Sequence, residues 1–156
     1  PGVGGHCIAV DPWFIVARDE KNSKLILKAR QVNNNKTNWV IEQIKLAASD
    51  ANARGIEKPI IVCLGLTFKP DIDDLRQSPA LFIAESLVQE GFDVVAVEPN
   101  IKSHIRFELM NLSKALKRAD VIAVLVKHKV FLTADVREIL KQKGALDFCG
   151  ALLDIE

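Results

Sequence analysis

The sequence has almost no net charge and no long apolar run, and both scarcities exclude classes of protein. Its 156 residues carry 21 Lys and Arg against 20 Asp and Glu, a formal charge of +1. Such a balanced chain gives no reason to expect nucleic acid or an anionic membrane as its main partner. The longest apolar runs, such as Val121–Val126, are far too short for a membrane span. No charged and apolar leader precedes a cleavage site, so secretion is not indicated either.

Cysteine is also scarce. Cys7, Cys63 and Cys149 are an odd and widely spaced set without a CxxC pair. Such a set fits neither a disulfide framework nor a zinc site, so we expect no metal. A reducing cytoplasm is the simplest location for three free thiols.

Proline and glycine are absent from one long stretch, Lys24–Ala53. Apolar residues recur there at steps of three and four, which predicts a long amphipathic helix that ends at Arg54–Gly55. Its buried stripe is expected to consist of Leu25, Ala29, Val32, Val40, Ile44 and Ala47. Before this helix, Pro12 suits the first turn of a shorter one, with Asp11 as its N-cap.

From residue 55 onward, apolar runs alternate with helical segments. PIIVCLGL is continuous and rich in β-branched residues, which is typical of a strand buried on both faces. We expect strands at Pro59–Leu66, Asp93–Asn100, Val121–Val126 and Ala151–Glu156, and helices at Ser78–Gly91, Leu112–Arg118 and Thr133–Lys143. Ser78 and Thr133 are the expected N-caps. The alternation predicts an α/β fold, a Rossmann-like open parallel sheet preceded by the long helix, with a helical segment at residues 1–54 and an α/β domain at residues 55–156.

Two glycine-containing stretches resemble a dinucleotide-binding fingerprint, and neither completes it. GVGGHC has the first two glycines of GxGxxG, but Cys7 stands at the sixth position and no strand precedes it. LGLTFKP follows a predicted strand, yet Lys69 and Pro70 stand where the helix should open. Glu98 ends the second predicted strand, where a ribose-binding acid would lie. Without the glycines, NAD binding by this sheet alone is not favoured.

Cys7 has two interpretations. Next to consecutive glycines its backbone can approach a ligand closely, and a helix starting at Pro12 could direct positive potential at it, as a nucleophilic thiol requires. Free cysteine is also often a small buried hydrophobe. Asp11 could hold a water or a partner cation. Cys63 lies within a predicted strand and Cys149 in a turn, so both are interpreted as structural.

The loop Phe68–Pro79 follows the carboxyl end of the first predicted strand, where open α/β sheets bind ligands. Lys69 and Arg76 could grip a phosphate or a carboxylate. The aspartates of the loop could equally form a solvated acidic segment that pairs with those bases, and the residues alone leave both possibilities open. His104 and His128 show no triad spacing and are expected at the surface.

Two of these stretches, GVGGHCIAVDPWF and LTFKPDIDDLRQSPA, together resemble the UDP-glucose/GDP-mannose dehydrogenase family. The resemblance covers the whole chain in the family's order: catalytic loop, long central helix, C-terminal α/β domain. It implies oxidation of an alcohol on a UDP-sugar to a carboxylate with two NAD+. Cys7 matches the nucleophile that forms a thiohemiacetal and then a thioester, and Asp11 matches the aspartate that assists the water.

The resemblance also implies how ligands and partners are bound. Gly4 lies in the loop whose backbone touches the sugar nucleotide, and Phe68 and Lys69 match the substrate contacts of the C-terminal UDP-sugar-binding domain. Arg76 matches an arginine that reaches toward NAD. The long helix matches the family's central dimerisation helix, so a homodimer is expected.

The sugar is the least determined part of this expectation. The His before the cysteine and the Asp-Pro-aromatic sequence after it favour UDP-N-acetyl-D-mannosamine. UDP-N-acetylglucosamine and UDP-glucose stay open as alternatives, as does a non-catalytic module that binds a UDP-sugar or dimerises. The family's N-terminal NAD domain would precede Pro1, so we expect this chain to be part of an enzyme and inactive alone. NADH formed from UDP-N-acetylmannosamine and NAD+ by this chain alone would contradict that expectation.

Overall fold

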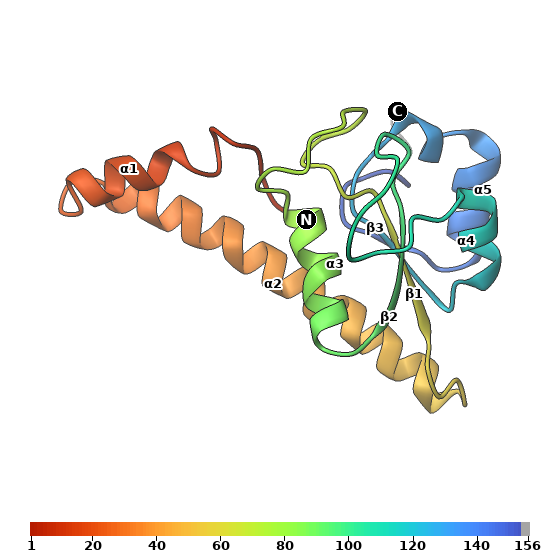
Figure 1. Cartoon of the computed structure of the whole chain (residues 1–156). Coiled ribbons are helices and arrows are strands. Elements are labelled where there is room, and N and C mark those ends of the chain that lie inside the picture. The colour runs from red at the N-terminus through yellow and green to blue at the C-terminus, as the bar shows by residue number, and fades with distance from the viewer. Residues whose placement is uncertain (154–156) are drawn as a thin grey trace.

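The computed structural model describes residues 1–153, in which two helices precede an α/β unit (Figure 1). In chain order the elements are α1 (Asp11–Arg18), α2 (Lys24–Ala53), β1 (Ile60–Leu64), α3 (Pro79–Gln89), β2 (Asp93–Val97), α4 (Leu112–Arg118), β3 (Val121–Val124), the short 3-10 helix η1 (Lys129–Phe131), α5 (Ala134–Gln142) and β4 (Leu146–Asp147). The strands of the described residues form one parallel sheet in the order β2-β1-β3-β4. The α/β prediction is therefore confirmed.

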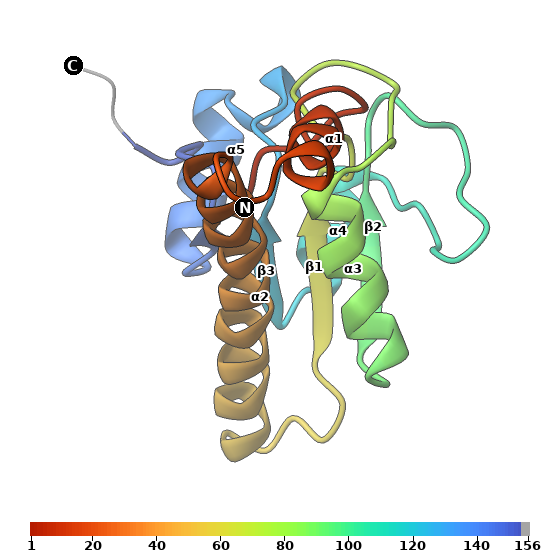
Figure 2. The same ribbon diagram turned by 90° about the vertical axis from the view of Figure 1, so that its left-hand side faces the viewer.

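The sheet is covered on both faces because side chains alternate along its central strand. Cys63 on β1 pairs with Ala96 on β2 and with Ala123 on β3, and all three face the core under α2 and α3. Their neighbours Val62 and Leu64 face the second core, under α4 and α5. Figure 2 shows α2 and α3 on one side of the strands and α4 on the other. A strand buried on both faces explains the unbroken apolar run of β1.

Helix α2 crosses from this core into solvent. Its C-terminal half packs on the sheet, where Val40, Ile44 and Ala48 are fully buried. Its N-terminal half projects away from the sheet with α1 alongside it (Figure 1). There Leu25 is 83% exposed, Val32 is 57% exposed and Ala29 is exposed as well, so the expectation that these three belong to a buried stripe is wrong. We call residues 1–5 the glycine loop, residues 6–35 the arm and residues 36–153 the body.

Two of the predicted helix caps differ from the structure. Asp11 is the first residue of α1 rather than its N-cap, which is Val10, and no side chain caps that end. Thr133 precedes α5 without a capping bond from its side chain. Ser78 caps α3 as predicted, because its hydroxyl accepts the Leu81 N–H at 3.3 Å. Both ends of α2 and of α4 lie where they were predicted.

The last strand lies earlier in the chain than expected. It is Leu146–Asp147, whereas the strand predicted from Ala151 is absent over residues 151–153, and residues 154–156 lie outside the described part of the chain. The carboxylate of Asp147 accepts the backbone N–H groups of Cys149 and Ala151, both at 3.1 Å, and of Leu152 at 2.8 Å. These bonds fold the chain into a turn directly after β4, so it cannot continue as a strand.

Among residues 1–153, no helix combines the length and the apolar character that crossing a bilayer requires.

Candidate functional site

The glycine loop lies against the segment between β1 and α3. Gly4 is buried, and a Cβ there would collide with the Gln77 carbonyl oxygen and the Pro79 ring. Gly5 has φ +100° and packs on the Phe68 ring, and its N–H donates to the Gln77 carbonyl at 3.3 Å. The glycines are therefore needed for close approach of the two backbones. The predicted site residues Gly4 and Phe68 are brought together.

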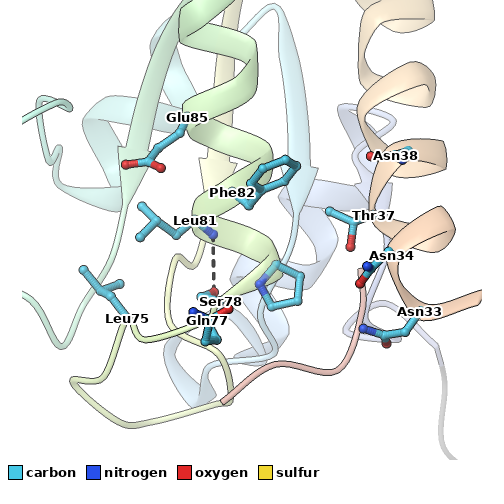
Figure 3. A pocket seen from close by; sticks show the side chains of 11 residues that line it. Asn33, Asn34, Thr37, Asn38, Leu75, Gln77, Ser78, Leu81, Phe82 and Glu85 are labelled. Carbon is cyan, nitrogen blue, oxygen red and sulfur yellow. Dashed lines mark hydrogen bonds between the residues drawn. The ribbon is translucent and has the colours of Figure 1, made fainter. Parts of the chain in front are cut away.

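Helix α2 holds the same loop from the other side. The Asn33 amide pairs with one residue in both directions: it accepts the Val3 N–H at 2.7 Å and donates to the Val3 carbonyl at 3.0 Å. The Thr37 hydroxyl donates to the Pro1 carbonyl at 3.3 Å. Beside these contacts α2 and α3 enclose a cavity of about 500 Å³, lined with amide side chains from α2 and with Leu81, Phe82 and Glu85 from α3 (Figure 3).

Cys7 stands one turn before α1 and is exposed to solvent. Its carbonyl accepts the N–H groups of Val10 at 3.0 Å and Asp11 at 2.8 Å, so Cys7 and Asp11 are one helical turn apart. Side chains four residues apart in such a turn lie on the same side. Asp11 is exposed as well. Cys7 is therefore not a buried core thiol, which removes one of its two interpretations.

An ion pair from the β1–α3 segment lies next to this cysteine. Arg76 donates from Nε and Nη2 to the carboxylate of Asp74, at 3.0 and 2.6 Å. The pKa of Asp74 is lowered to about 2, first by the side-chain bond from Arg76 and then by the Arg76 backbone N–H. The pKa of Arg76 is raised, mainly by Asp74 and weakly by the charge of Cys7. His6 Nδ1 lies 4.0 Å from the Asp74 carboxylate, so the arm meets the body here.

A second cavity, of about 320 Å³, opens at the carboxyl ends of β1 and β3. The glycine loop forms one wall, and Phe68, Lys69 and Lys127 form others. The Lys69 ammonium lies 5.6 Å from the centre of the Phe68 ring, and the Lys69 side chain is exposed. Two lysines beside one cavity at this edge of a parallel sheet suit a phosphate-bearing ligand. We call it the sheet-edge pocket.

His128 is fully buried, so the expectation that it lies at the surface is wrong. Its Nε2 is 3.1 Å from a carboxylate oxygen of Glu98. Burial raises the pKa of Glu98, but bonds from His128 and from the N–H groups of Leu66 and Asn100 outweigh it, so the net pKa is lowered. The other predicted surface histidine, His104, is half-buried and stacks on Phe107 at 4.8 Å between ring centres.

The same bonds decide whether this sheet fits a dinucleotide. Glu98 holds the position of a ribose-binding acid, but it is 5% exposed and its oxygens accept the N–H groups of Leu66, Thr67 and Asn100. A carboxylate so engaged has no free face for a ribose hydroxyl. Together with the single glycine after β1, this arrangement does not fit NAD at the sheet.

The two remaining cysteines lie where they were predicted, one in a buried strand and one in the turn after β4. Cys63 is buried in β1, and burial raises the pKa of its thiol to about 12. Cys149 is half-buried beside the sheet-edge pocket, and burial together with the charge of Asp147 raises its pKa to about 12.

Several residues that line or support the site were not assigned to it from the sequence. Lys127 and His128 directly follow the apolar run of β3, so the rule that ligands bind at the carboxyl ends of parallel strands would have found them. Asn33 and Thr37 sit one helical turn apart on α2, and their spacing reveals a shared face but no partner.

Comparison with known proteins agrees with this geometry. Residues 62–153 match the model of the UDP-glucose/GDP-mannose dehydrogenase family, UDP binding domain. A UDP-N-acetyl-D-mannosamine dehydrogenase from Campylobacter jejuni is 52% identical over 84% of this chain and 33% of its own length. An NDP-N-acetyl-D-galactosaminuronic acid dehydrogenase from Ralstonia solanacearum is 47% identical over 96% of the chain and 35% of its own length.

A solved UDP-N-acetyl-mannosamine dehydrogenase from S. aureus superposes with a TM-score of 0.70 and 38% identity, over 85% of this chain and 30% of that one. The chain thus spans about a third of the length of the relatives that it matches. By the match of residues 62–153 to the family model, and by relatives that are 52% and 47% identical, it belongs to the UDP-glucose/GDP-mannose dehydrogenase family.

Proposed function

We propose that this chain supplies the catalytic cysteine and the UDP-sugar site of an NAD-dependent dehydrogenase that oxidises UDP-N-acetyl-D-mannosamine to its uronic acid. One observation carries the proposal. The glycine loop that leads to Cys7 packs on Phe68, and Phe68 also lines the sheet-edge pocket with its two lysines. A nucleotide sugar held by the pocket can therefore extend along the loop toward the thiol.

The proposed binding roles follow from charge. Lys69 and Lys127 would pair with the diphosphate, each as a point charge that tolerates several phosphate geometries. The backbone at Gly4 would approach the sugar, since no side chain intervenes. The Phe68 ring would pack against the ligand from the wall that it shares with the glycine loop.

The proposed chemistry centres on Cys7. The alcohol carbon would first lose a hydride, and its hydroxyl a proton, to give an aldehyde. The Cys7 thiolate would then form a C–S bond to the carbonyl carbon, whose oxygen takes a proton to give a thiohemiacetal. Loss of a hydride from that carbon and of the hydroxyl proton leaves a thioester. Water then attacks, the C–S bond breaks and the thiol leaves with the proton while the carboxylate forms. Asp11, one helical turn away, would accept the proton of the attacking water. NAD+ supplies the acceptor for the hydrides.

The NAD that this reaction requires does not fit the sheet, because the Glu98 carboxylate already accepts the N–H groups of Leu66, Thr67 and Asn100. One contact is proposed from the described residues. The Arg76 side chain is 64% exposed beyond its bond to Asp74, so its guanidinium can face an anionic group of a bound dinucleotide near Cys7.

The sugar is proposed from the relatives in C. jejuni and S. aureus, whose names specify N-acetylmannosamine. A second candidate is an N-acetylgalactosamine nucleotide, favoured by the R. solanacearum relative that is 47% identical over 96% of the chain. The three free thiols support a reducing, cytoplasmic setting.

A homodimer is proposed through the arm half of α2. Leu25 and Val32 give that face an apolar surface that has no cover within the described chain. Sedimentation equilibrium measures this directly, and a monomer at every concentration would contradict it.

Calorimetric titration with UDP-N-acetylmannosamine, UDP-N-acetylglucosamine and UDP tests the binding proposal. We expect all three to bind, and Lys69→Ala and Lys127→Ala each to weaken binding about tenfold, because each removes a charge-assisted contact to phosphate. Lys114→Ala is the matched control, since Lys114 is an exposed lysine on α4, which packs under the opposite face of the sheet from α2 and α3. Absence of binding by the folded wild type would contradict the proposal. Equal binding of the two sugars would place sugar selection outside this chain.

A further inference from the structure

A buried polar cluster joins the ends of three neighbouring strands. His128 follows β3, Glu98 follows β2, and Thr67 and Asp71 follow β1. The His128 ring is fully buried and makes contacts through both nitrogens. Because β1 lies between β2 and β3, the imidazole bridges all three strand ends beneath the sheet-edge pocket.

The contacts of the ring fix its tautomer. The Asp71 N–H donates to Nδ1 at 2.9 Å, and a backbone N–H can only donate. Nδ1 therefore carries a lone pair, and the proton lies on Nε2. Nε2–H then donates to the Glu98 carboxylate at 3.1 Å, with the Thr67 hydroxyl oxygen a second neighbour at 3.4 Å. That hydroxyl has its own proton engaged on the Lys69 carbonyl, at 3.0 Å.

The hydrogen bond to His128 Nδ1 comes from a residue whose backbone conformation is uncommon, Asp71. Asp71 has φ +59°, in the left-handed region that favours glycine. Its N–H is held by His128, and its carboxylate in turn accepts the Lys129 N–H at 3.0 Å. At the other end of the short segment, the Thr67 N–H donates to Glu98 at 3.2 Å. The residues pinned between these two points are Phe68, Lys69 and Pro70, which all line the pocket.

We propose that His128 is a positioning residue for the sugar nucleotide: as the Nε2–H tautomer, it fixes the backbone of residues 67–71 through the Asp71 N–H and so sets where Lys69 meets the diphosphate. This inference rests on the proposed function for the role of Lys69. The structural part, a nitrogen-to-nitrogen hydrogen bond in one tautomer, stands apart from it and is measurable without ligand.

The first test is made on wild-type protein without ligand. Nitrogen-15 NMR should show a scalar coupling between the Asp71 amide nitrogen and the His128 Nδ1, with the ring proton on Nε2. The opposite tautomer, or no coupling when both signals are assigned, overturns the inference whether or not the protein binds UDP. Because no substitution is made, the result does not depend on a variant that folds.

The second test uses two substitutions, each of which keeps one hydrogen bond of the His128 ring and removes the other. In His128→Asn, the side-chain oxygen lies near the position of Nδ1 and can still accept the Asp71 N–H. In His128→Gln, the amide nitrogen lies near the position of Nε2 and can still donate to Glu98, but the Asp71 N–H is left without its acceptor. We expect the Gln variant to lose about tenfold in UDP affinity and the Asn variant less than about threefold.

Melting temperature and Asp71 amide exchange are recorded for both variants. A merely structural role predicts that affinity follows melting temperature, with both variants weakened alike, and that outcome overturns the inference. Faster Asp71 exchange in the Gln variant alone, with weaker UDP binding in the same variant, supports it. If wild-type protein binds no UDP, the proposed function fails, while the coupling and exchange measurements still decide the positioning of Asp71.

Discussion

Helix α2 belongs partly to the arm and partly to the body, and several of its apolar side chains are exposed in the arm but buried in the body. In the body half of α2, Val40 and Ile44 are fully buried against the sheet. In the arm half of the same helix, Leu25 is 83% exposed and Val32 57%. The spacing of apolar residues is similar in both halves, so it indicates that a face is apolar and not what covers it.

The arm inverts the usual distribution of polar and apolar groups. Arg30 and Ser23 are buried there, and within the described chain the Arg30 Nε and the Ser23 hydroxyl have no hydrogen-bond partner. Phe14 on α1 is meanwhile 70% exposed. Monomeric surfaces seldom combine exposed aromatics with unpaired buried polar atoms. The body exposes apolar side chains as well, among them Ile105 at 97% and Phe82 at 53%. The buried polar atoms without a partner, together with the exposed apolar side chains, support the proposed contact of the arm with a second copy of the chain.

The largest contrast between the regions is expected in thiol reactivity. Cys7 of the arm is exposed, whereas the thiols of Cys63 and Cys149 in the body have pKa values raised to about 12. At pH 8 a thiol with such a pKa is roughly one part in ten thousand thiolate, the form that reacts. Iodoacetamide at pH 8 should therefore alkylate Cys7 completely before the other two react, as mass spectrometry of tryptic peptides measures. Cys7→Ser serves as the control. Alkylation of Cys149 as fast as that of Cys7 would contradict the prediction.

The next contrast lies along α2 itself. Ile44→Ala should lower the free energy of unfolding by about 2–5 kcal/mol, because it leaves a cavity in the core under α2 and α3. Leu25→Ala, on the exposed half of the helix, should change it by less than about 0.5 kcal/mol at protein concentrations where the chain is monomeric, and by more where the proposed homodimer forms. Urea unfolding followed by circular dichroism measures both. A loss of similar size in Leu25→Ala would mean that the arm face is covered in solution, and its dependence on protein concentration would identify a second copy of the chain.

Sequence reasoning fixed the elements of the body well, because each has a local cause. Both ends of α2 and of α4 were predicted correctly: Gly55 follows the end of α2, and the Asn111 side chain caps the start of α4. The first three strands were predicted too long, and the fourth was predicted after the position of β4. Leu125 and Val126 continue the apolar run of β3, but both of their N–H groups donate to the Leu64 carbonyl, so the chain turns while it is still buried. The chain stays buried for two residues beyond the last paired residue of β3. The apolar sequence indicates burial, but it does not indicate where the pairing of strands ends.

The site was predictable in part for the same reason. Phe68 and Lys69 line the sheet-edge pocket, and their position at the end of a predicted strand was visible in the sequence. His128 was assigned to the surface because its partner, the Asp71 N–H, is 57 residues away and leaves no local signal. The Asn33 amide is likewise 30 residues from Val3. The side chains that fix the site are those whose partners come from other strands or helices, and such pairs require the fold. The roles of all the predicted site residues stay predictions: Cys7, Asp11, Gly4, Phe68, Lys69 and Arg76.

The smallest expected effect lies at the joint between the two regions. The pKa of Asp74 is lowered from its ordinary 3.8 to about 2, first by the side-chain bond from Arg76, with a lesser contribution from His6 of the arm. A depressed carboxyl pKa stabilises the fold above the unfolded value, and that contribution is lost as pH falls from about 4 to about 2. Because the ion pair is exposed, salt screens it and its effect on stability is slight.

Carbon-13 NMR of the Asp74 carboxyl measures this joint directly. We expect it to titrate near pH 2 in wild type and to return toward 3.8 in Arg76→Ala, with Arg54→Ala, a distant exposed arginine, leaving it unchanged. In His6→Ala the value should rise only slightly, because His6 Nδ1 is 4.0 Å from the carboxylate and makes no hydrogen bond with it. A large rise of the Asp74 pKa in His6→Ala would mean that His6 lies closer to Asp74 in solution than 4.0 Å. The neighbouring Cys7 would then also lie closer to the Asp74–Arg76 ion pair, and the arm would be less separate from the body than the exposure of α2 indicates.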